Sequence, residues 1–271
     1  MSAWLGPVGG LIEFVHYQGA VKTKHDREVT LQTTIGGGRF ALTAPATNLR
    51  SWAVSTEGID SSQWAAFDAL RSGAYGDRNY FLSPLAQVTN LITPAKSMPG
   101  MGGETAGVNG DALAGGLMFT PEGIRVPSMI SGGGAAYLRV DVPVRPGTQV
   151  TGSVYVAGSG VQVRSWWVDA ALKHVSVSSW PVVTSTELTR AANTTTVPED
   201  AHAVYITVTG ATAIAAPAVT WTDTARPWTV GRGCDNAIIS DVSESEVLAG
   251  RWNNQQAADF DFTVTEVGAG A

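Results

Sequence analysis

The sequence has little cysteine, and it has no apolar run of membrane-spanning length that is free of Gly, Pro and charge. Its one cysteine, Cys234, cannot form a disulfide within the chain or supply a multi-cysteine metal site, so we interpret it as a small buried residue. The N-terminus has no basic segment ahead of an apolar one, as a signal peptide would have. The sequence therefore predicts a soluble protein that is made in the cytoplasm and does not insert into a membrane.

Charge is also scarce. Charged residues make up 15% of the chain, and 17 basic residues against 23 acidic ones give a formal net charge of −6. This balance offers no electrostatic footprint for nucleic acid, so we expect no nucleic-acid partner. The 31 glycines and the abundant Ser and Thr favour short strands joined by tight turns over long helices. We predict a mainly β protein with, at 271 residues, roughly two domains.

The order of the segments predicts that one domain is inserted into another. Residues 1–88 alternate as strands and contain one helix after Asp60, with Trp64, Phe67 and Leu70 on one face and Gly73 at its end. Residues 89–228 are predicted to form a second β unit, bordered by a glycine-rich loop at 95–116. Residues 229–271 end in a strand that is too short to form a core alone, so they should pair with the first segment.

The predicted fold class is therefore a discontinuous β-barrel or β-sandwich with one helix, carrying an inserted β-sandwich of the jelly-roll, galactose-binding-like kind. An inserted domain needs its own core and two ends that lie close together. Such a domain usually forms a separable functional module.

Catalytic and metal-binding patterns are absent from the sequence. His16, His25, His174 and His202 are scattered without ligand spacing, and no nucleophile elbow or phosphate loop is present. Asp259 and Asp261 flank Phe260 on the outward face of a predicted strand, where a solvated edge is the simpler interpretation. We expect no enzyme activity, no cofactor and no metal, although a structural calcium stays open.

The strongest candidate site is aromatic. In the predicted strand 161–168, Val161, Val163 and Trp167 should face the core while Gln162, Arg164 and Trp166 face outward. Aromatic faces with nearby hydrogen-bond donors suit sugars, which present apolar C–H faces and hydroxyl groups. The alternative is that this patch packs on the other domain or on another subunit. The residues of the predicted carbohydrate-binding surface are Trp166, Arg164, Gln162, Tyr155, Tyr137, Arg139 and Tyr205.

A resemblance to a known family rests on four short patterns: Asn90-Leu91-Ile92, Asp169 after a strand, Ala216-Pro217-Ala218-Val219, and Pro227-Trp228 continuing to Gly231-Arg232-Gly233-Cys234. With these patterns the chain resembles the minor tail proteins of phages that infect actinobacteria. The resemblance implies a split, distal-tail-like hub domain that forms a ring at the tail tip, and an insert similar to jelly-roll carbohydrate-binding modules. It supplies no catalytic residues.

We therefore expect a structural virion protein of the phage tail tip or baseplate. Its partners would be copies of itself in a ring, expected to be a hexamer, other tail proteins, and host cell-wall polysaccharide bound weakly by many copies. The second hypothesis is a stand-alone carbohydrate-binding protein without a tail role. The third is a cell-wall hydrolase, which would require two carboxylates converging in a cleft.

Overall fold

The computed structural model is mainly β and divides into two compact units. The split unit comprises residues 1–7, 12–81 and 235–271, and the inserted unit comprises residues 8–11 and 82–234. Residues 8–11, 82–88 and 229–234 thus belong to the inserted unit, whereas the sequence predicts them as parts of the outer segments. The structure describes residues 2–15, 21–26, 29–33, 39–43, 49–76, 79–101, 113–131, 136–247 and 257–267.

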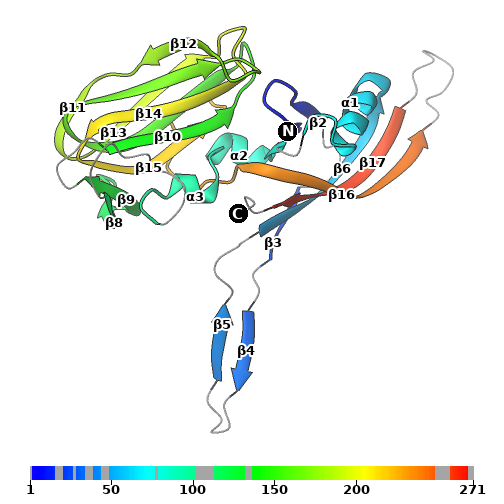
Figure 1. Cartoon of the computed structure of the whole chain (residues 1–271), viewed down its shortest axis with the longest axis horizontal. Coiled ribbons are helices and arrows are strands. Elements are labelled where there is room, and N and C mark those ends of the chain that lie inside the picture. Colours follow the sequence, from blue (N-terminus) through cyan, green and yellow to red (C-terminus); the bar gives the residue numbers. More distant parts are fainter. Residues whose placement is uncertain are drawn as a thin grey trace. The chain divides into compact units, whose positions relative to one another are not determined.

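The split unit is built on one seven-stranded sheet in the order β2-β1-β7-β16-β17-β6-β3. Its strands are β1 (Ser2–Gly6), β2 (Ile12–Val15), β3 (Lys22–Asp26), β6 (Leu49–Asp60), β7 (Asn79–Leu82), β16 (Cys234–Val247) and β17 (Ala257–Glu266) (Figure 1). The C-terminal strand β17 pairs antiparallel with β6, so that Phe262 lies opposite Val54. The two ends of the sequence therefore build one sheet.

The helix predicted after Asp60 is α1 (Ser61–Arg71), and its apolar face closes the core of the split unit. Phe67 is fully buried and packs edge-on or tilted against Phe14, Phe260 and Phe262, with ring centroids 5.7, 5.1 and 5.0 Å away. Burying a phenylalanine side chain contributes about 2–3 kcal/mol. The alternation predicted for the C-terminal strand is confirmed, since Phe260 and Phe262 point into this core.

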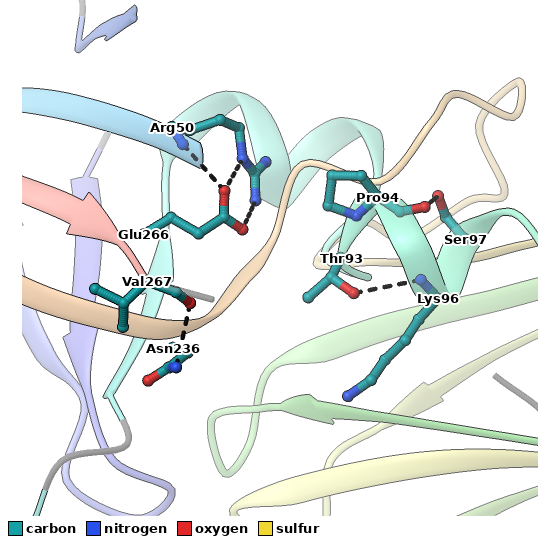
Figure 2. Close-up of polar contacts among 8 residues, drawn as sticks. All are labelled: Arg50, Thr93, Pro94, Lys96, Ser97, Asn236, Glu266 and Val267. Carbon is teal, nitrogen blue, oxygen red and sulfur yellow. Dashed lines mark hydrogen bonds and ion pairs between the residues drawn. The ribbon is translucent and has the colours of Figure 1, made fainter. Parts of the chain in front are cut away.

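One ion pair ties the start of β6 to the end of β17. The guanidinium of Arg50 donates from Nε to Oε2 of Glu266 at 2.8 Å and from Nη2 to Oε1 at 2.7 Å (Figure 2). Arg50 is 5% exposed, so this fork-to-fork pair is largely shielded from water. It holds the ends of two strands that lie more than two hundred residues apart in sequence.

Two further strands, β4 (Val29–Thr33) and β5 (Arg39–Thr43), form a ribbon of their own, with Leu31 opposite Ala41. Within the described residues, neither strand joins the seven-stranded sheet.

The inserted unit begins with two short helices, α2 (Pro84–Thr89) and α3 (Pro94–Ser97), which the sequence pattern does not predict. Each has proline in its first turn and a hydroxyl cap. Ser83 accepts from the amide of Ala86 at 3.2 Å. Thr93 accepts from the amide of Lys96 at 3.4 Å (Figure 2). The predicted loop at 95–116 is therefore wrong at both ends, because α3 covers 94–97 and a strand begins at Leu113; residues 102–112 lie outside the described part.

Two antiparallel sheets form the inserted sandwich, and the long strand β11 (Gln149–Val168) belongs to both. We call them the Trp166 sheet and the Tyr155 sheet after residues in the two halves of β11. The Trp166 sheet contains β10 (Ala136–Pro143), β14 (Ala203–Ala211), the C-terminal half of β11 and β12 (His174–Ser179). The Tyr155 sheet contains β13 (Val183–Thr196), the N-terminal half of β11, β15 (Ala213–Thr220), β9 (Arg125–Ser131) and β8 (Leu113–Phe119).

Strand β11 passes from one sheet to the other at two glycines. Gly158 and Gly160 have φ of 147° and 69°, and the pairing with β13 shifts register on either side of Gly158. Before the bend, the even-numbered Val154 and Val156 are fully buried; after it, the odd-numbered Val163 and Trp167 are 1% exposed. The bend therefore changes which positions of the strand face the core between the sheets.

The ends of the inserted unit are joined by the residues that carried the family resemblance. Asn90 is fully buried and uses its whole amide: Nδ2 donates to the carbonyls of Pro217 and Thr229 at 3.1 and 3.0 Å, and Oδ1 accepts from the amides of Ile92 and Val219, both at 3.2 Å. We call these contacts the Asn90 junction. They bring the entry and exit of the unit to the end of β15, as an insertion requires.

Glycine is required where the exit segment passes the entry segment. A Cβ on Gly233 would lie 1.7 Å from the carbonyl oxygen of Leu91, and a Cβ on Gly231 would lie 2.1 Å from that of Ile92. The amide of Gly233 donates to the Ile92 carbonyl at 3.1 Å. The Gly-Arg-Gly pattern therefore has a steric cause.

Candidate functional site

The outward face of the Trp166 sheet carries two rows of residues that run across its strands. Asp141, Tyr205, Trp166 and Val177 are cross-strand neighbours on β10, β14, β11 and β12. The next row is Arg139, Thr207, Arg164 and Ser179. Directly opposite residues in antiparallel strands share a face, so both rows lie on one surface, which we call the Trp166 face.

Trp166 is at the centre of this face and is half-buried. Its ring is parallel to that of Tyr205, with 6° between the planes and 6.0 Å between the centroids, which is the range of an offset pair. On its other side His174 meets it edge to face at 5.2 Å. The indole Nε1 donates to the hydroxyl of Thr207 at 3.0 Å, so the ring is fixed in orientation while part of its surface stays accessible to solvent.

Polar groups border the aromatic pair. Nη2 of Arg164 donates to Oε1 of Gln162 at 2.6 Å, and these two residues lie along β11 on the same face as Trp166. Gln162 is exposed and Arg164 is half-buried. The face thus offers a flat apolar surface next to guanidinium and amide donors.

The structure brings four of the predicted site residues together: Gln162, Arg164, Trp166 and Tyr205. The division of strand 161–168 into a core face and an outward face is confirmed by the burial of Val161, Val163 and Trp167. The backbone of Arg139 is in register with Thr207 on the same sheet, and Tyr137 sits at an irregularity between the pairs formed by Ala136 and Leu138. The side chains of Tyr137 and Arg139 lie outside the described part.

The prediction for Tyr155 is wrong. Tyr155 precedes the bend of β11, so it belongs to the other sheet, where it is 2% exposed in a cluster with Val126, Leu188 and the partly buried Trp228. The guanidinium of Arg190 lies over its ring at 5.7 Å. Burial raises the pKa of Tyr155, and a hydrogen bond with the side chain of Glu122 raises it further. Tyr155 is therefore part of the packing of the Tyr155 sheet.

Sequence reasoning missed His174 as a member of the site. It was treated as one of four scattered histidines, because its contact with Trp166 depends on the antiparallel pairing of β11 with β12. The pairing brings His174 next to Val168, across an irregularity from the Trp167 and Ser176 pair. The run from Trp166 to His174, with a turn at residues 169–173, was the available signal.

The residues considered for catalysis do not gather into a site in the part that is described. Asp259 and Asp261 lie on β17, opposite Ser245 and Ser243 of β16, and alternate with the buried Phe260 and Phe262. No three His, Cys, Asp or Glu side chains come close enough to hold a metal among the described residues. Cys234 is buried, as expected. No described helix has the length and apolar character needed to cross a membrane.

Comparison with known proteins finds similarity at the level of structure. No protein-family model matches the chain, and no curated protein matches it. A tailspike protein 4 domain of bacteriophage CBA120, described as enzymatically active, aligns with 49% of this chain at 13% identity and a TM-score of 0.40. A family 16 carbohydrate-binding module aligns with 50% of it at 17% identity and a TM-score of 0.33.

The third similar structure contains the CBM22-1 and GH10 modules of a Clostridium thermocellum endo-1,4-β-D-xylanase complexed with xylohexaose. It aligns with 44% of this chain at 16% identity and a TM-score of 0.32. The match spans 21% of the tailspike chain, 26% of the xylanase chain and 96% of the isolated module. The similar solved structures thus include a phage tailspike domain and carbohydrate-binding modules.

Proposed function

We propose that this protein is a structural component of a phage tail that contacts glycans of the host cell wall through the Trp166 face. The split unit would form the ring at the distal tail, and the inserted sandwich would carry the contact. The protein would act by binding, without a catalytic step. The observation that carries the binding function is the parallel pair of Trp166 and Tyr205 on the outward face of a sandwich inserted into another unit.

The Asn90 junction supports the modular part of this proposal. An insert that contacts a ligand outside the particle must keep its fold while the host unit assembles. The buried amide of Asn90 and the close approach of Gly231 and Gly233 fasten the two ends of the sandwich to each other within the inserted unit itself. Three of the patterns that resemble actinobacteriophage minor tail proteins meet at this junction.

The orientation of Trp166 supports the glycan part. Its indole nitrogen is satisfied by Thr207, so the ring does not need a further polar partner, and what it offers a ligand is apolar surface. Sugars bind such surfaces by their C–H faces, while Arg164 and Gln162 can reach the hydroxyl groups. A single face of this kind binds weakly, and many copies in a ring raise the avidity.

A pull-down of the full chain on purified actinobacterial cell walls tests the glycan contact. Trp166→Ala should abolish binding at wall concentrations that retain the wild type. Phe119→Ala is the matched control, because Phe119 is a 66% exposed aromatic residue on the Tyr155 sheet of the same sandwich. Equal binding by Trp166→Ala and the wild type would refute the role of the Trp166 face.

Particles test the tail role. Gold-labelled antibodies against the inserted unit should decorate the distal end of intact tails, and the purified chain should form a closed ring by native mass spectrometry. Labelling elsewhere, or absence of the protein from particles, would instead favour a stand-alone carbohydrate-binding protein.

A further inference from the structure

Arg164 has a different kind of partner from Arg50 and Arg71. Arg50 pairs with Glu266, and Arg71 pairs with Asp68 at 2.9 Å. The partner of the Arg164 guanidinium is the neutral Gln162, and within the described residues no carboxylate lies within ion-pair distance of it. Among the described residues, the Trp166 face therefore carries a cation that no carboxylate neutralises.

The position of this cation suits a ligand that also contacts Trp166. Arg164 and Trp166 are two residues apart on β11, so their Cα atoms are separated by roughly 7 Å on the same face. A sugar ring stacked on the indole would place an anionic substituent within reach of the long arginine side chain. Its fork of donors matches a carboxylate or phosphate in two-point contact.

Gln162 adds a reason to regard the guanidinium as held in place. Its Oε1 accepts one N–H of Arg164 at 2.6 Å, which leaves the other donors of the planar group free to bind a ligand. A guanidinium that is already oriented loses less entropy on binding than a free one.

We propose that the Trp166 face binds acidic saccharides, with the sugar ring on Trp166 and its carboxylate or phosphate on Arg164. This inference rests on the proposed function in that it assumes that the face binds a glycan. It adds the charge of that glycan. Because the whole chain has a net charge of −6, long-range attraction does not recruit a polyanion, and the selectivity arises from short-range contact at Arg164.

Binding of the full chain to defined saccharides tests this. The probes are oligogalacturonates, the same oligomers after carboxyl reduction, and a glycerol-phosphate polymer; purified cell walls are measured in parallel. The wild type should prefer one or both acidic probes to the neutral oligomers. Arg164→Gln should weaken binding of the preferred acidic probe by about ten- to a hundredfold, as loss of a charge-assisted contact does, and leave neutral oligomers unaffected.

Two further variants make the result specific. Arg164→Lys keeps the charge but not the two-point contact, so it should bind between the wild type and Arg164→Gln. Arg125→Gln removes an exposed cation from the Tyr155 sheet and should bind like the wild type. Preference for the carboxylate probe or the phosphate probe identifies the anionic group.

The outcomes separate this inference from the proposed function. One outcome is that Trp166→Ala loses binding to cell walls, while acidic and neutral saccharides bind the wild type equally and Arg164→Gln binds like the wild type. This outcome would overturn the inference and leave the proposed function standing. Selective binding of acidic probes without binding to walls would support the inference and refute the host-wall contact. A folded wild type that binds none of the saccharides and no walls would overturn both.

Discussion

Replacing Asn90 by alanine should destabilise the inserted unit more than any other single polar substitution that we consider. The side chain is fully buried and makes four hydrogen bonds, two donated and two accepted, to main-chain groups of Ile92, Pro217, Val219 and Thr229. Alanine would leave two carbonyl oxygens and two amides buried without these partners.

The magnitude follows from the cost of buried unpaired groups. Each costs about 1–3 kcal/mol, but the costs do not add fully, because the backbone can relax and water can enter the space of the lost amide. We expect Asn90→Ala to lower the free energy of unfolding of the inserted unit by about 3–5 kcal/mol. Asn90→Asp should cost nearly as much, since a carboxylate cannot donate to the carbonyls of Pro217 and Thr229.

Hydrogen exchange measured in increasing urea resolves the two units by their peptides and gives the loss for residues 149–168 separately. Asn193→Ala is the control, because Asn193 is half-buried and its recorded side-chain bond is a local one to Thr195 at 2.7 Å; it should cost about 1 kcal/mol or less. A loss below about 1 kcal/mol for Asn90→Ala would refute the role assigned to the junction.

Three other predictions concern stability. In urea unfolding, Gly233→Ala should destabilise the inserted unit by more than Gly147→Ala does, because a Cβ on residue 233 would lie 1.7 Å from the Leu91 carbonyl oxygen. A Cβ on residue 147 would enter open space, so that variant should cost only the strain of φ 72°, about 1–2 kcal/mol. Equal losses would contradict the steric reason. Arg50→Ala should lower the stability of the split unit by about 2–4 kcal/mol in the same exchange measurement, and the exposed-pair variant Arg71→Ala by less than about 1 kcal/mol; similar small losses would show that the buried pair contributes little. Burial raises the pKa of Tyr155 above its ordinary value of 10.0, so the folded state keeps the phenol proton to higher pH than the unfolded state. The free energy of unfolding that depends on this proton is complete below pH 10 and is lost as the pH rises above it. The wild type should therefore lose more stability than Tyr155→Phe between pH 9 and 11, and parallel losses would refute this assignment.

The sequence predicts which side chains face the core wherever the spacing of apolar residues within one helix or strand determines it. The alternation in strand 161–168 separated Trp166 from Trp167, and the spacing of Phe67 and Leu70 placed the core face of α1, because each pattern depends only on the geometry of its own element. Asn90 and the Gly-Arg-Gly segment were recognised as patterns, but their physical cause requires the contact between residues far apart in the chain.

Tyr155 shows what alternation along a strand cannot predict. Alternation indicates that its side chain points away from the buried Val154 and Val156, which is correct, but not to which sheet the residue belongs. The bend at Gly158 and Gly160 moves β11 from one sheet to the other, and this crossing is set by pairing with β13 and β14. The contact of His174 with Trp166 is equally a product of strand register: the short run between the two residues indicates a hairpin, but the register decides which side chains meet.

The most direct test of the account is hydroxyl-radical footprinting of the full chain, free and bound to purified cell walls. Trp166 and Tyr205 should be protected by the walls. Phe119 on the Tyr155 sheet, and Trp228, which packs against the Tyr155 cluster, should oxidise at the same rate in both states. Protection of Phe119 and Trp228 with no change at Trp166 would contradict the assignment of the binding surface to the Trp166 face.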